Sequence, residues 1–105
     1  MPGLKFKYFF IFGILFTFCG CVTPHPPNDE YTFAKAAIEA AKSVQAVRYS
    51  SGYWHQAEES YRQAKILYSN RDYEEARDLF IKARLAAERA ENSARLIRQK
   101  NGDIL

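Results

Sequence analysis

Small and apolar residues recur at alternating steps of three and four through the last third of the chain, from Asp72 to Arg98. The positions in this seam are Tyr73, Ala76, Phe80, Ala83, Ala87, Ala90, Ala94 and Ile97. Such spacing places them on one face of a helix that can lie along a partner helix. It predicts a helix of about 26 residues and about 40 Å. We expect a capping box of Asp72 and Glu75 at its start and Gly102 as its stop.

Two shorter seams precede this helix. The first consists of Phe33, Ala37, Ala40, Val44 and Val47, and it predicts a helix over residues 29–49. The second consists of Trp54, Ala57, Tyr61, Ala64 and Tyr68, and it predicts a helix over residues 53–69. Asn28 or Asp29 can cap the first helix, and Gly52 supplies a left-handed position after it. Asn70 is expected to be left-handed in the short turn that follows the second helix.

The short turn before Asp72 forces the last two helices to run antiparallel. We therefore predict an all-α fold, an antiparallel three-helix bundle over residues 29–105. Alanine fills most seam positions of the last helix, so its partners are expected to approach closely. A bundle this small has only a few kcal/mol of stability, of the order of 3–5 kcal/mol.

The N-terminus has the composition of an export signal. Lys5 and Lys7 precede an apolar run over residues 8–18, which is short for a membrane span and normal for a signal peptide. The segment around Gly20 and Cys21 resembles the lipobox of bacterial lipoproteins, in which the cysteine is acylated and becomes the first residue. We expect a cleaved signal peptide over residues 1–20 and lipid attachment at Cys21; an uncleaved signal anchor is the alternative.

Acyl chains at Cys21 would hold the protein on a membrane, since each buried methylene contributes about 0.8 kcal/mol. Val22 follows the cysteine, and by resemblance to the sorting rule of enteric bacteria this predicts the periplasmic face of the outer membrane, with the inner membrane as the alternative. Residues 21–28 form a lipidated, proline-rich linker, expected to hold the bundle roughly 20 Å from the bilayer.

Charge and residue types exclude several classes of function. The formal net charge is +3, from 15 basic and 12 acidic residues. Removal of Lys5 and Lys7 with the signal leaves a charge near +1, which argues against nucleic-acid binding. His55, Glu58 and Glu59 share one helical face, but three groups from one stretch of helix make a poor metal site, and a solvated face is the simpler interpretation. We expect no catalytic residues, no cofactor and no metal.

Two resemblances concern the helical part. Residues 54–84 resemble a single tetratricopeptide repeat, with Ala64 in its first helix and Tyr73, Ala76, Phe80 and Ala83 in its second. Over residues 34–98 the order is an alanine-rich helix, Gly52-Tyr53, a second alanine-bearing helix, the segment DYEEAR and an alanine-periodic last helix. This order is similar to the bacterial lipoproteins of the domain of unknown function 4398 family. That resemblance implies a helical envelope lipoprotein and no established activity.

Three apolar residues of the last helix exceed what one narrow seam can bury, namely Leu85, Leu96 and Ile97. Exposed apolar surface of this kind often marks an interface, so they are the candidate interface residues; shielding by the first helix is the alternative. The expected function is that of a non-enzymatic envelope lipoprotein that binds a protein partner or itself. The alternative is a small binding protein for peptidoglycan, lipid or metal, or a single tetratricopeptide-like adaptor.

Overall fold

The computed structural model describes residues 25–102, and this part of the chain is helical with no strand. The elements are α2 (Asn28–Ser43), α3 (Ala46–Tyr49), α4 (Ser51–Ser69) and α5 (Tyr73–Lys100). The predicted all-α class is confirmed. The expected signal peptide and Cys21 lie outside the described residues.

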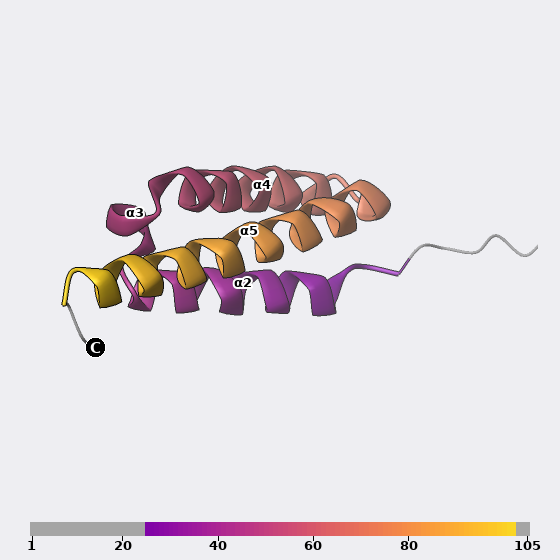
Figure 1. Cartoon of the computed structure of the whole chain (residues 1–105). Coiled ribbons are helices and arrows are strands. Elements are labelled where there is room, and N and C mark those ends of the chain that lie inside the picture. The colour runs from indigo at the N-terminus through magenta and orange to yellow at the C-terminus, as the bar shows by residue number, and fades with distance from the viewer. Residues whose placement is uncertain (1–24, 103–105) are drawn as a thin grey trace, which may run out of the picture.

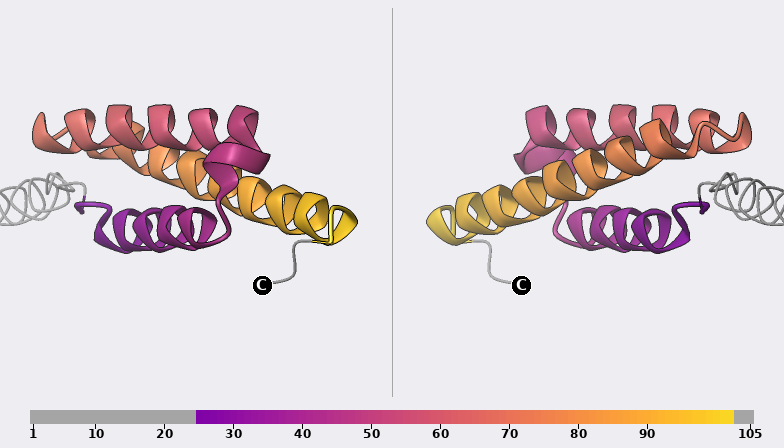
Figure 2. Two further views of the ribbon diagram at one scale, coloured as in Figure 1. Left: turned by 90° about the vertical axis from the view of Figure 1, so that its left-hand side faces the viewer. Right: turned by 90° about the vertical axis from the view of Figure 1, so that its right-hand side faces the viewer.

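The three long helices are arranged around α5. In Figure 1, α5 runs between α2 and α4, and α4 runs antiparallel to both. The side views of Figure 2 show α5 crossing obliquely from the start beside α4 toward the end of α2. α5 packs against α4 and α2 over much of its length, whereas α2 and α4 contact each other at few positions. The fold is therefore organised by the alanine-rich helix.

The predicted seam of α5 forms the core. Ala76, Ala83, Ala87, Ala90 and Ala94 have no solvent exposure, and Phe80 is the largest fully buried side chain. The ends of that seam, Tyr73 and Ile97, are half-buried. Small side chains along α5 allow the flanking helices to approach closely, and the large side chains come from elsewhere, such as Trp54 of α4, which packs among the alanines at the end remote from the linker.

The first helix differs from the expectation in length and in the face that it buries. It ends at Ser43, and Gln45 adopts a left-handed conformation with φ 61° before the short α3 begins. Phe33, expected in the seam, is 56% exposed. The buried residues are Ala34, Ile38 and Ala41, one position further along the chain. The predicted phase was wrong for Phe33, because the sequence offers two seams in this helix and packing against α5 buries the other one, although Val44 of the predicted seam is buried.

Each long helix is followed by a residue in the left-handed conformation. The backbone hydrogen bonds at the helix end determine which residue takes that conformation. After α4, the Asp72 N–H donates to the Leu67 carbonyl at 2.9 Å and the Arg71 N–H donates to the Tyr68 carbonyl at 3.1 Å. This is a Schellman motif, which requires a left-handed residue directly before Asp72. Arg71 has φ 63°, so it takes that position and the prediction of Asn70 was wrong.

Three other local predictions have clear outcomes. Gly102 has φ 76° and ends α5 as expected, with its N–H donating to the Gln99 carbonyl at 3.2 Å. The capping box was wrong, because Asp72 makes no side-chain hydrogen bond to the start of α5. Gly52 lies within α4 rather than in a left-handed turn, and Gln45 takes the turn position instead.

The last residues of the expected linker are docked on the bundle. Pro27 is fully buried. Arg77 of α5 donates through Nη2 to the His25 carbonyl at 3.1 Å and pairs through Nε with Glu30 at 3.3 Å. The predicted free spacer up to Asn28 was therefore too long, because its end is held by packing and by one arginine of α5.

Candidate interaction surfaces

An aromatic cluster joins the three long helices at the linker end. Phe80 of α5 is at its centre, with its ring centroid 5.0 Å from that of Tyr31, 5.9 Å from Tyr61 and 6.4 Å from Tyr68. The rings meet edge to face, the arrangement that aromatic quadrupoles favour. Tyr31 of α2 also meets Tyr61 and Tyr68 of α4, with ring centroids 5.9 Å apart in both pairs, so these rings bridge two helices that are close at few other positions.

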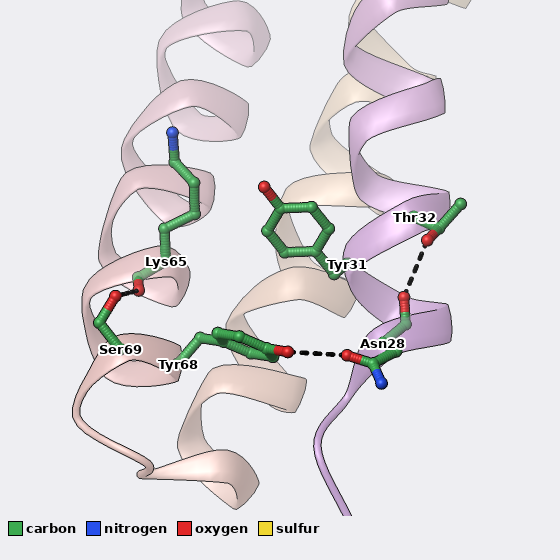
Figure 3. A pocket seen from close by; sticks show the side chains of 6 residues that line it. All are labelled: Asn28, Tyr31, Thr32, Lys65, Tyr68 and Ser69. Atoms are coloured by element: carbon green, nitrogen blue, oxygen red, sulfur yellow. Dashed lines mark hydrogen bonds between the residues drawn. The ribbon is translucent and has the colours of Figure 1, made fainter.

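Next to these rings, α2 and α4 form the walls of a groove, here called the α2–α4 groove. Figure 3 shows its linker end, where Tyr31 and Tyr68 point into the space between the two helices. The Tyr68 hydroxyl donates to Asn28 Oδ1 at 2.8 Å, and Lys65 Nζ lies 4.7 Å from the Tyr61 ring centroid. The far half of the groove is lined by Lys35, Ile38, Glu39, Lys42, Glu58, Tyr61, Arg62 and Lys65.

The phenol of Tyr61 is less acidic than an ordinary tyrosine. Burial, followed by a side-chain hydrogen bond with Tyr31, raises the pKa of Tyr61 to about 12. The nearby carboxylate of Glu39 adds to the same shift. The environment of Tyr61 thus favours the neutral phenol over the phenolate.

A second surface lies where α2 meets α5 on the other side of the molecule, and it carries exposed apolar side chains. Phe33 and Ile81 line one groove there, and they are 56% and 37% exposed. Leu85, 43% exposed, follows Ile81 by one helical turn and therefore extends the same surface. We call Phe33, Ile81 and Leu85 the α2–α5 patch.

Charges flank the α2–α5 patch on opposite sides. Asp29 and Glu30 line its groove from the first turn of α2, and Arg84 lines it from α5. Arg84 is loosely held: its nearest carboxylate, on Glu88, lies 3.9 Å away, and its buried Nε has no hydrogen-bond partner. Asp29 makes no ion pair among residues 25–102. The patch thus carries an acidic corner, Asp29 and Glu30, and a basic corner, Arg84, and both Asp29 and Arg84 can accept a further ion-pair partner.

The three candidate interface residues separate in the structure. Leu85 belongs to the α2–α5 patch. Leu96, 59% exposed, lies three turns further along α5, and Ile97 is half-buried. Neither α2 nor α3 covers Leu96. The neighbouring Arg98 has a structural contact instead, because its Nη1 donates to the Val44 carbonyl at the end of α2 at 3.2 Å.

Sequence reasoning missed Phe33 and Ile81 as surface residues and did not connect Arg84 with them. A signal for Phe33 existed, since Tyr31, Ala34, Ile38 and Ala41 form an equally regular seam with Phe33 outside it. Ile81 and Arg84 had no such signal, because their neighbourhood depends on how α2 lies on α5. Cys21, the predicted lipid-attachment residue, lies outside the described residues, so its role stays a prediction.

Residues 25–102 contain no cluster of histidine, cysteine, aspartate or glutamate with the geometry of a metal site. Glu59, considered above as a ligand with His55 and Glu58, pairs with Arg62 at 2.8 Å and accepts from Gln63 at 3.1 Å. No helix in this part of the chain is both long and apolar enough to cross a bilayer.

The fold and its surfaces define a small helical module whose core is rich in alanine, with a few large side chains such as Phe80 and Trp54 among them. The sequence matches the family described as Domain of unknown function (DUF4398) over residues 29–102, and the chain belongs to that family. No curated protein and no solved structure gives a significant match to the chain. The family assignment carries no activity, so any function rests on the surfaces just described.

Proposed function

We propose that the protein is a non-enzymatic lipoprotein of the cell envelope whose antiparallel three-helix bundle acts as a protein-interaction module. The observation that carries this proposal is the α2–α5 patch. Large apolar side chains from two helices converge there on the outside of a domain whose core is rich in alanine. Exposed apolar surface between rigid helices is typical of protein interfaces.

The anchor in this proposal is Cys21, acylated after removal of residues 1–20, on the periplasmic face of the outer membrane or alternatively the inner membrane. Its support is the sequence pattern at Gly20 and Cys21. Labelling of cells with radioactive palmitate should mark the wild type and leave Cys21→Ala unlabelled. Cys19→Ala is the matched control and should be labelled normally. Labelling that persists in Cys21→Ala would refute the lipid anchor.

The interaction role is tested separately from the anchor. Wild type, Leu85→Ser and Leu96→Ser are purified from detergent-solubilised envelopes after crosslinking, and co-purifying protein is compared. Loss of a crosslinked species in Leu85→Ser, but not in Leu96→Ser, is the expected result, since Leu85 alone belongs to the α2–α5 patch. If no crosslinked species forms with the wild type, or if neither substitution changes it, the interaction role is wrong.

A second candidate function is supported by the α2–α4 groove. Tyrosines line it and lysines stand on its rim, which is a suitable environment for a hydroxyl-rich or acidic ligand such as a glycan of the cell wall. Sedimentation with purified peptidoglycan tests this candidate. Binding that is lost when Lys35 and Lys65 are both replaced by glutamate would favour it over the interaction module, and absence of sedimentation would eliminate it.

A further inference from the structure

The charges around the α2–α5 patch have a self-complementary arrangement. The acidic corner, Asp29 and Glu30, belongs to the first turn of α2, whereas the basic corner, Arg84, lies on α5 about one turn beyond Ile81. Phe33 and Ile81 line the same groove as the two corners. A two-fold axis through this apolar centre exchanges the corners, so the acidic corner of one molecule meets the basic corner of another. A two-fold contact of this kind is isologous, with the same surface used by both copies.

We propose that the α2–α5 patch is the contact between two copies of this chain. Phe33, Ile81 and Leu85 of one copy cover the same residues of the other, and Asp29 of each copy pairs with Arg84 of its partner. The inference deepens the proposed interaction module by naming its occupant, and it rests on that proposal only for the existence of an interaction.

Two features of Arg84 favour this occupant over an uncharged partner. Its buried Nε lacks a hydrogen-bond acceptor, and a buried donor of this kind costs stability until an acceptor arrives. Its Glu88 contact at 3.9 Å is too long for a good hydrogen bond, so the guanidinium can turn toward a second carboxylate. Asp29, which has no ion-pair partner within residues 25–102, is the carboxylate that a second copy brings to the required place.

The charges also predict how the contact responds to mutation. In an isologous pair, Asp29→Arg places two arginines opposite each other at each corner, and Arg84→Glu places two carboxylates opposite each other. Each single variant therefore loses its homodimer. A mixture of the two single variants, however, restores an arginine–carboxylate contact at both corners. The double variant restores both contacts as well. This pattern of loss and rescue belongs to a two-fold contact between these two residues.

The experiment uses the full-length lipidated protein in detergent micelles, followed by sedimentation velocity from 1 to 100 µM. We expect the wild type to dimerise in this range, each single variant to dimerise at least tenfold more weakly, and the mixture and the double variant to recover. Glu39→Arg, on the α2–α4 side of the same helix, is the matched control and should dimerise normally. Circular dichroism melts verify that each variant is folded.

Three results would overturn the inference. They are a wild type that stays monomeric at 100 µM, a dimer that neither charge reversal weakens, and a mixture of single variants that stays monomeric. A photo-crosslinking amino acid at Leu85 in cells provides the independent measurement. A product of twice the chain's mass supports the second copy, whereas a product with a different protein assigns the patch to that partner. None of these results affects palmitate labelling at Cys21. Failure of the dimer is therefore distinguishable from failure of the proposed anchor.

Discussion

Replacement of Phe80 and Phe33 by alanine provides a direct comparison between the core and the α2–α5 patch. Phe80 has no solvent exposure and contacts the rings of Tyr31, Tyr61 and Tyr68, whereas Phe33 is 56% exposed. The two substitutions remove the same atoms, so the difference between them measures burial alone. The seam predicted from sequence placed both residues inside, and the structure separates them.

The magnitudes follow from these environments. A buried Phe→Ala substitution costs about 3–5 kcal/mol, because the transfer free energy of the ring is lost and a cavity remains. Phe33 buries only about half of its surface, and burying a whole ring contributes about 1.5–3 kcal/mol, so Phe33→Ala should cost about 1 kcal/mol. Since 1 kcal/mol shifts the Tm of a domain this size by about 4–8 °C, Phe80→Ala should lower it by more than about 12 °C.

The assay is a thermal melt by circular dichroism at 222 nm at protein concentrations low enough to exclude self-association. Phe80→Ala should unfold near or below room temperature, because a bundle of this size has only about 3–5 kcal/mol of stability. Phe33→Ala should retain a cooperative melt a few degrees below the wild type. Equal losses in the two variants would refute the observed packing of α2 and would support the seam through Phe33.

Three smaller effects can be measured on the same preparations. The raised pKa of Tyr61, near 12, means that its neutral form stabilises the fold below pH 10 and that this contribution is lost as the pH rises through 12; Tyr61→Phe should therefore weaken the fall in Tm between pH 10 and 12 relative to the wild type. Arg71→Gly should increase the free energy of unfolding by up to about 1 kcal/mol, seen as a higher urea midpoint at unchanged m. A left-handed non-glycine residue costs about 1–2 kcal/mol, and glycine loses part of that gain through its greater chain entropy in the unfolded state. Arg98→Met keeps the apolar stem and removes the contact with the Val44 carbonyl at the end of α2, and a loss of about 1 kcal/mol is expected in urea titrations; an unchanged midpoint would show that the contact is not made in solution.

The parts of the fold that were predictable from sequence are those with one dominant periodicity. The seams of α4 and α5 alternate aromatic residues or alanine with charged residues over four or more turns, and the structure buries most of these positions. The first helix offered two seams of equal regularity, one through Phe33 and one through Ile38. Packing against α5 decides between them, and nothing local to the helix does.

Local breaks and distant contacts were the remaining misses. Glutamine has no particular preference for a left-handed conformation, so the sequence around Gln45 carried no signal for the end of α2. The docking of the linker end involves Arg77, which lies 52 residues beyond its hydrogen-bond partner His25 in the sequence. Of the α2–α5 patch, sequence reasoning identified only Leu85. Phe33 and Ile81 were missed because they come together only when α2 lies beside α5.

The docked linker also limits where a partner can be found. If Cys21 carries the acyl chains, the four residues to His25 span at most about 14 Å when fully extended. His25 is fastened to Arg77, and Ile81 follows Arg77 by about one turn of α5. Arg98, in contrast, lies about 30 Å further along the helix axis. With that anchor, the α2–α5 patch would lie at the end of the bundle nearest the membrane, and a second copy anchored in the same way would reach it without an extended arm.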